Sequence, residues 1–252
     1  MAKVIGVIPA RYGSTRFPGK PLALIAGKPL LQWVIEGSQK SKHLSQILVA
    51  TDDERIATLA KKCGVEVAMT PSELPSGSDR VWFALKDKNF DVAINIQGDE
   101  PLIQAEILDA LASAMIANPA CEMGTLGHPF KNEADILNPN TAKIILNHNQ
   151  EAIYFSRFPI PFSRDKDMTK TLGQGGQSVN LQHIGIYAYR KDFLRKFCET
   201  PIQPLEQFEG LEQLRALYLG AKIKVVTVHY ETRGVDTPED VILVEKQLAK
   251  RS

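Results

Sequence analysis

The sequence predicts an α/β fold, a mostly parallel sheet with helices on both faces, that carries a β-rich insert. The first observation is an alternation of short β-rich runs with helix-period segments over the first hundred residues. The second is that this alternation stops after Pro119, where β-like runs take over. We therefore expect one α/β domain over residues 1–252, in which residues 121–190 form the insert.

The elements of the first half follow from apolar spacing and end signals. Apolar, β-branched runs at 4–8, 46–51, 65–70 and 91–97 predict buried strands. Helical spacing predicts helices at 28–40, 53–64, 78–88 and 105–118. Pro29 suits a first helical turn, Gly64 suits a helix end, and Ser78 or Asp79 is the expected cap of the third helix.

The elements of the second half are less regular. Strands are expected at 142–147, 152–157 and 183–190, with a long polar stretch at 163–178 between the last two. Its Gly-rich end, 173–178, predicts a mobile loop. An amphipathic helix at 204–220, a strand at 222–230 and a final helix from Pro238 complete the expected order.

Composition excludes several classes of protein. The 252 residues are 44% apolar and 23% charged with a net charge of +1, so no global field attracts nucleic acid or an anionic membrane. Cys63, Cys121 and Cys198 are scattered and odd in number, which argues against a disulfide framework or a thiolate zinc site. We find neither a signal-peptide pattern nor an apolar run of membrane-spanning length, so a cytoplasmic protein without membrane insertion is expected.

One short segment after the first strand, Val7 to Leu22, gathers three cations, Arg11, Arg16 and Lys20. It is not a P-loop, because its glycines are one residue too far apart and a proline follows the lysine, and no G-x-G-x-x-G is present. Such a loop at the carboxyl end of a parallel strand suits a polyphosphate. The alternative from the residues alone is a solvated basic loop.

The segment PARYGSTRFPGKPL resembles the N-terminal signature of cytidylyltransferases for 3-deoxy-D-manno-octulosonate (Kdo). Later segments are similar to that family in the same order: NIQGDEPLI, YFSR, HIGIYAYR, LEQLRAL and GVDTPED. The resemblance implies a Rossmann-like nucleotide-diphospho-sugar transferase fold. It also implies that CTP and a 2-keto-3-deoxy sugar acid react to give a CMP-sugar and pyrophosphate, a step of lipopolysaccharide biosynthesis. The implied cofactor is Mg²⁺, and the implied assembly is a homodimer formed through residues 121–190.

The resemblance also assigns the site. The expected catalytic residues are Lys20, Arg16, Asp99 and Asp236, and the two aspartates are the expected magnesium ligands. Expected CTP contacts are Pro9, Ala10, Arg11, Ser14, Thr15, Arg16, Lys20, Ser76, Gly77, Arg80 and Gln97. Expected sugar contacts are Gln97, Arg157, His183, Tyr187, Glu212 and Gln213.

The plainer alternatives for the two aspartates are an exposed turn acid for Asp99 and a helix cap for Asp236. Against the second, Thr237 with Asp240 already forms a T-x-x-D capping pattern, which leaves Asp236 unused as a cap.

The chain departs from the family at ELPSGSDR, where the family pattern is D-H-x-S-G-T-[DE]-R. Leu74 replaces the histidine, Glu73 the aspartate and Ser78 the threonine. Loss of an imidazole that can itself be cationic would suit a sugar with an amine, so the 8-amino-3,8-dideoxy analogue of Kdo is a candidate substrate. A CMP-sialic acid synthetase and a non-catalytic nucleotide-binding regulatory module remain alternatives.

Overall fold

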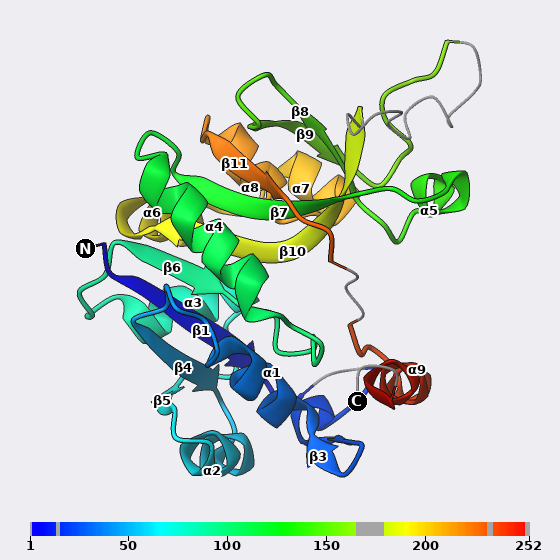
Figure 1. Ribbon diagram of the computed structural model, residues 1–252. Helices are drawn as coiled ribbons and strands as arrows, with labels where there is room; N and C mark the ends of the chain where they lie inside the picture. The colour runs from blue at the N-terminus through cyan, green and yellow to red at the C-terminus, as the bar shows by residue number, and fades with distance from the viewer. Residues whose placement is uncertain (1, 14–15, 165–178, 231–233, 250–252) are drawn as a thin grey trace. The chain divides into compact units, whose positions relative to one another are not determined.

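The computed structural model describes residues 2–13, 16–164, 179–230 and 234–249 (Figure 1). The chain forms two compact units, one of residues 1–112 with 232–252 and one of residues 113–231. The Gly-rich loop expected at 173–178 lies outside the described residues, as do Ser14 and Thr15. The β-rich region expected at 121–190 falls within the second unit, and its part in a dimer stays a prediction.

The first unit is built on a parallel sheet of the four expected strands, in the order β6-β1-β4-β5. These strands are β1 (Val4–Ala10), β4 (Gln46–Thr51), β5 (Glu66–Met69) and β6 (Val92–Asn95). β1 lies in the middle and its apolar side chains are fully buried, as expected for a strand covered on both faces. The carboxyl ends of β1, β4 and β6 therefore point to one edge, where a ligand site is expected.

The expected helices of this unit are also present: α1 (Leu30–Ser38), α2 (Glu54–Lys62), α3 (Gly77–Leu85), α4 (Ala105–Ala117, which runs on into the second unit) and α9 (Pro238–Ala249). Short elements that were not expected are η1 (Lys20–Leu22), β2 (Leu24–Ile25) and β3 (Lys28–Pro29). The expected cap of α3 was wrong. Ser76, not Ser78 or Asp79, accepts the backbone N–H of Asp79, so the helix begins earlier, at Gly77.

The second unit has strands in the order β11-β7-β10-β8-β9. β10 (Asn180–Arg190), β8 (Lys143–Leu146) and β9 (Ala152–Ser156) pair antiparallel, whereas β11 (Ile223–Thr227) is parallel to β7 (Met123–Pro129). β7 was not expected, nor were α5 (Glu133–Leu137) and α6 (Lys191–Glu199). β7 was not predicted because its glycines weaken the strand signal in the sequence. A Cβ on Gly127 would meet Leu181 at 2.8 Å, so packing rather than a turn requires glycine there.

The single helix expected at 204–220 was wrong. The chain forms α7 (Pro204–Glu209) and α8 (Leu214–Tyr218), separated by Gly210 in the left-handed conformation at φ 62°. Glycine adopts this conformation without steric cost, so α7 ends there. The break exposes the last carbonyl groups of α7 to a partner outside the helix.

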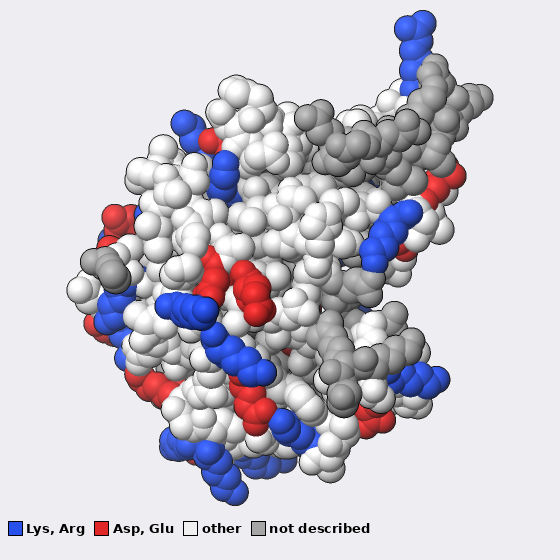
Figure 2. Space-filling model, viewed as in Figure 1, with Lys and Arg blue, Asp and Glu red and all other residues white. Residues whose placement is uncertain are grey.

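None of the described helices is long and apolar enough to cross a membrane. Figure 2 shows acidic and basic side chains interspersed over the face in view, in line with the net charge of +1. No broad basic surface of the kind that binds nucleic acid is visible on that face.

Candidate active site

A cavity of about 290 Å³ lies in the first unit at the carboxyl ends of β1 and β6. Every predicted nucleotide or metal residue that the structure describes lines it: Pro9, Ala10, Arg11, Arg16, Lys20, Ser76, Gly77, Arg80, Gln97, Asp99 and Asp236. These residues come from four separate parts of the chain. The sheet edge thus assembles the site, as the strand order requires.

Lys20 lies at the centre of the cavity's charges. Its Nζ is 2.7 Å from Asp99 Oδ2 and 3.3 Å from Asp236 Oδ1. Arg16 Nη2 lies 3.1 Å from the same oxygen of Asp236. The Lys20 side chain is only 14% exposed, so water screens its charge little and its attraction to nearby anions is stronger than in open solvent. The structure therefore brings together two aspartates that stand far apart in sequence.

The backbone holds the two aspartate segments side by side. The N–H of Val235 donates to the carbonyl of Asp99 at 2.9 Å. A Cβ on Gly98 would lie 2.7 Å from the Pro9 carbonyl, so only glycine lets this turn pack against the end of β1. Gly98 was missed as a site residue, although its place directly before Asp99 in QGDEP was a usable signal.

Asp236 does not cap α9. The carboxylate of Asp240 accepts the backbone N–H groups of Asp236 and Thr237 at 3.0 and 2.9 Å, which satisfies the start of the helix. The Asp236 side chain instead faces Arg16 and Lys20. The capping alternative is thereby contradicted, and a role as a cation ligand stays open to the Asp236 carboxylate.

Arg80 is a structural cation as much as a cavity residue. It is 3% exposed, and its guanidinium donates to Asp52 at 2.9 Å, to the Thr70 hydroxyl at 2.5 Å and to the Pro71 carbonyl at 3.1 Å. These bonds fasten α3 to the segments that follow β4 and β5. Its predicted contact with a nucleotide stays a prediction.

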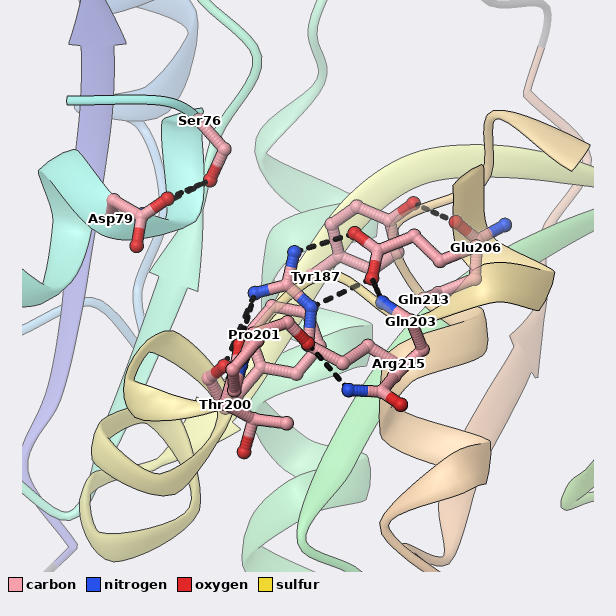
Figure 3. A network of polar contacts seen from close by, with 10 residues as sticks. Ser76, Asp79, Tyr187, Thr200, Pro201, Gln203, Glu206, Gln213 and Arg215 are labelled. Carbon is pink, nitrogen blue, oxygen red and sulfur yellow. Dashed lines mark hydrogen bonds and ion pairs between the residues drawn. The ribbon is translucent and has the colours of Figure 1, made fainter. Parts of the chain in front are cut away.

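The second unit holds the other predicted cluster. The Tyr187 hydroxyl donates to Gln213 Oε1 at 3.0 Å, a bond drawn in Figure 3, and Gln213 Nε2 lies 3.4 Å from Nδ1 of His183. Burial lowers the pKa of His183 to about 3, so its ring is neutral. Burial, and then the nearby Glu212 carboxylate, raise the pKa of Tyr187, so its phenol keeps its proton.

Arg157 is held by backbone carbonyls. Its Nε donates to Glu209 O at 2.8 Å, its Nη1 to Pro139 O at 3.1 Å, and its Nη2 to Gly210 O at 3.3 Å. The break after α7 supplies two of these acceptors. Lys143, fully buried, donates to the carbonyl of Arg157 at 2.7 Å. The guanidinium is thus fixed in place, with N–H groups left over for an anion.

The comparisons with known proteins agree with one another. The family model described as cytidylyltransferase matches residues 5–223. The chain is 51% identical over 249 residues to the 3-deoxy-manno-octulosonate cytidylyltransferase of Bdellovibrio bacteriovorus, with 99% of each chain covered. It is 45% identical over 244 residues to that of Solibacter usitatus, with 97% of this chain and 94% of the relative covered.

The chain belongs to the 3-deoxy-manno-octulosonate cytidylyltransferase family. A solved structure of CMP:2-keto-3-deoxy-manno-octonic acid synthetase complexed with CTP superposes on it with a TM-score of 0.90, at 38% identity and over the full length of both chains. The predicted α/β fold of the nucleotide-diphospho-sugar transferases, with its mainly parallel sheet, is confirmed.

For a cytidylyltransferase of this family, the chain's departure at ELPSGSDR has a definite place. Leu74 and Pro75 line the same cavity as Lys20 and Asp99. An apolar side chain therefore stands at the cavity wall where the family pattern has an imidazole. Neither residue was among the predicted contacts.

Proposed function

We propose that this chain transfers a cytidylyl group from CTP to a Kdo-type sugar acid and releases pyrophosphate, as the names of its relatives indicate. The observation that carries the proposal is the convergence of Asp99 and Asp236 on the ammonium of Lys20, inside a cavity that also holds Arg16. Both substrates are anions, and this arrangement places cations beside two carboxylates that could bind a metal ion instead of Lys20.

The reaction needs no nucleophile from the protein. The anomeric hydroxyl of the sugar attacks the α-phosphorus and gives up its proton to water as the new O–P bond forms. The bond to the β-phosphate breaks, with its electron pair leaving on pyrophosphate. Negative charge grows on the phosphoryl oxygens, and a pre-placed ammonium and guanidinium stabilise it. We assign this role to Lys20 and Arg16, with Arg11, Ser14 and Thr15 on the triphosphate. Base and ribose contacts are assigned to Pro9, Ala10, Ser76, Gly77, Arg80 and Gln97.

The two carboxylates fit a divalent ion. Mg²⁺ is usually held by one or two carboxylates together with substrate phosphates and waters, and the described residues contain no group of three or more histidines, cysteines or acids that would indicate another metal. Asp99 and Asp236 would hold Mg²⁺, which supplies positive charge beside the triphosphate. Since Lys20 binds both carboxylates here, we propose that it turns to the phosphates when the nucleotide binds.

The sugar contacts are proposed from the second cluster. Arg157 has N–H groups to spare for the sugar carboxylate, and Tyr187, Glu212 and Gln213 are assigned to hydroxyl groups, together with Gln97. Both ring nitrogens of His183 already contact Thr125 and Gln213, so we assign this residue to the support of Gln213 and Tyr187 and not to a direct sugar contact. A protonated Tyr187 is an uncharged hydrogen-bonding group, which suits a polyhydroxylated ligand.

A homodimer in the cytoplasm is also proposed. Phe158, Phe162 and Phe208 of the second unit are 73%, 86% and 93% exposed, and such apolar side chains favour burial against a second copy of the chain. Light scattering after gel filtration measures the mass, and replacement of Phe162 with Ser should shift it towards the monomer. The cytoplasmic location is supported by the three free cysteines, which a reducing compartment preserves.

The test is pyrophosphate release from CTP and Mg²⁺ with Kdo, its 8-amino analogue, N-acetylneuraminate or no sugar. We expect release with Kdo-type acids only, and Leu74 leads us to compare the amine and the hydroxyl forms directly. Preference for neuraminate would favour the sialic acid alternative. Binding of CTP without release by any sugar would refute the enzyme and favour a regulatory nucleotide-binding module.

A further inference from the structure

A β-bulge brings two predicted sugar residues together. In a regular strand, residues four apart are separated by about 13 Å. In β10, however, Ile184 pairs with Leu126 and Tyr187 pairs with the next residue of β7, Thr125, so two residues of β10 are left over. His183 and Tyr187 thereby come to a ring-centroid distance of 5.4 Å. The bulge re-aims both side chains to the same place, as bulges near binding sites do.

Two carbonyl groups of the bulge lie beside the Thr125 hydroxyl. Its oxygen lies 2.9 Å from Ile186 O and 3.2 Å from Ile184 O. A carbonyl oxygen can only accept, so contacts of this length require the hydroxyl proton to point at the bulge. The single proton of the buried Thr125 hydroxyl is therefore donated to the bulge, and the Thr125 oxygen can only accept from any third partner.

That third partner is His183. Its Nε2 lies 3.0 Å from the Thr125 oxygen, and because that oxygen accepts, Nε2 must carry the ring proton. Nδ1 is then an acceptor, and Gln213 Nε2 donates a hydrogen bond to it at 3.4 Å. The amide oxygen of Gln213 in turn accepts from Tyr187 at 3.0 Å. Each hydrogen bond in this series therefore has a defined donor and acceptor, and the bulge carbonyls determine them.

We infer that Thr125 is a positioning residue that fixes the tautomer of His183 and so leaves the phenol oxygen of Tyr187 free only as an acceptor. The group of the ligand that meets Tyr187 is therefore a hydrogen-bond donor, a hydroxyl or an ammonium. A carboxylate or ether oxygen is excluded there, since the phenol proton is committed to Gln213. This inference rests on the proposed function for the nature of the ligand, and on the contacts alone for the tautomer.

The opposite arrangement is distinct. With the ring proton on Nδ1, the amide of Gln213 would turn round and donate to Tyr187, whose proton would then be offered to the ligand. Thr125 would have to donate to Nε2 of His183, and its oxygen would then face the carbonyl oxygens of Ile184 and Ile186 without a proton between them. The tautomer of one ring therefore reports which of the two arrangements exists.

The experiment combines NMR with kinetics. Long-range nitrogen–proton correlation spectra of the labelled imidazole rings identify the tautomer of His183, assigned by its loss in His183→Gln. We expect Nε2–H in the unmodified chain and in Thr125→Ser, which keeps the hydroxyl. Thr125→Val has nearly the same shape but no hydroxyl, and should lose this fixed tautomer. It should also raise KM for the sugar about tenfold, while KM for CTP stays the same.

A ring proton on Nδ1 in the unmodified chain overturns the inference, and that measurement needs no variant to fold. An unchanged tautomer and an unchanged sugar KM in a folded Thr125→Val also overturn it. Equal losses in Thr125→Ser and Thr125→Val would mean that packing rather than the hydroxyl matters, which contradicts the inference as well. Absence of turnover in the unmodified chain would refute the proposed function, yet the tautomer would still be read directly.

Discussion

Replacing Lys20 with Met tests the centre of the site. The methionine keeps the apolar stem, so packing changes little, but the ammonium between Asp99 and Asp236 is lost. Removing a pre-placed group that stabilises developing charge lowers kcat by about 100- to 1,000-fold. We expect a loss of that size in CTP-dependent pyrophosphate release, at saturating sugar and Mg²⁺.

The effect on stability should be small. The carboxylates of Asp99 and Asp236 are 30% and 48% exposed, so each ion pair with Lys20 is partly screened by solvent. Two such pairs are worth about 1–2 kcal/mol in the free energy of unfolding, which lowers Tm by roughly 2–8 °C. Thermal unfolding followed by circular dichroism measures this quantity.

Lys28→Met is the matched control. Lys28 lies in the same unit, is 29% exposed and pairs with Glu36 at 2.6 Å, but it does not line the cavity. It should lose a similar amount of stability and keep kcat. A Lys20→Met enzyme that retains kcat within about threefold would refute the reasoning. So would a Lys28→Met enzyme that loses as much activity as Lys20→Met.

Three further predictions follow from single contacts. Asp236→Asn should raise the Mg²⁺ concentration for half-maximal rate at least about tenfold, whereas Glu239→Gln, which changes an exposed acid in the first turn of α9, should not. Equal titrations would remove Asp236 as a ligand. Gly19→Ala should lower the free energy of unfolding by about 1–3 kcal/mol and raise KM for CTP, because φ is +70° and the new Cβ would lie 3.0 Å from the Tyr12 ring. Gly13→Ala, whose new Cβ would have no atom within 4 Å, is the control, and an equal Tm for both variants would contradict this prediction. The pKa of His183 falls from 6.5 to about 3 on folding, so the unfolded chain binds one more proton between these values. Stability therefore drops as the pH is lowered there, by up to about 1.4 kcal/mol per pH unit and by less because the residue is half-buried. His183→Gln should flatten the dependence of urea-unfolding stability on pH, and an unchanged slope would count against a neutral ring.

The sequence predicted the parts of the fold whose signal is local. All four strands of the first unit were predicted in place, and three of them, β1, β4 and β6, are largely buried as expected for parallel strands covered on both faces. The expected burial of the fourth was wrong, because β5 lies at the edge of the sheet and its residues are half-buried or exposed. The strand order then placed the cationic loop and Asp99 at one edge without any knowledge of contacts. The place of Asp236 and the full set of cavity residues were named from the resemblance to the family.

What could not be predicted depends on contacts between distant residues. β7 has two glycines and a proline and so lacks a strand signal, because its shape is set by Leu181 and its neighbours. The helix expected at 204–220 ends at Gly210, a break that hydrophobic spacing alone does not reveal. The bulge in β10 shows only in the register with β7, so the role of Thr125 was invisible in the sequence.

The pairing of Lys20 with Asp236 joins positions 216 residues apart, and it has a consequence for how the protein is made. A ribosome finishes the sheet of the first unit and all of the second before it adds Asp236, the second proposed Mg²⁺ ligand. A nascent or shortened chain that stops before Val235 would carry the positively charged loop and only one of the two carboxylates. On the proposed role of Asp236, such a chain could bind a nucleotide but would lack catalytic competence until the segment just before α9 has been synthesised.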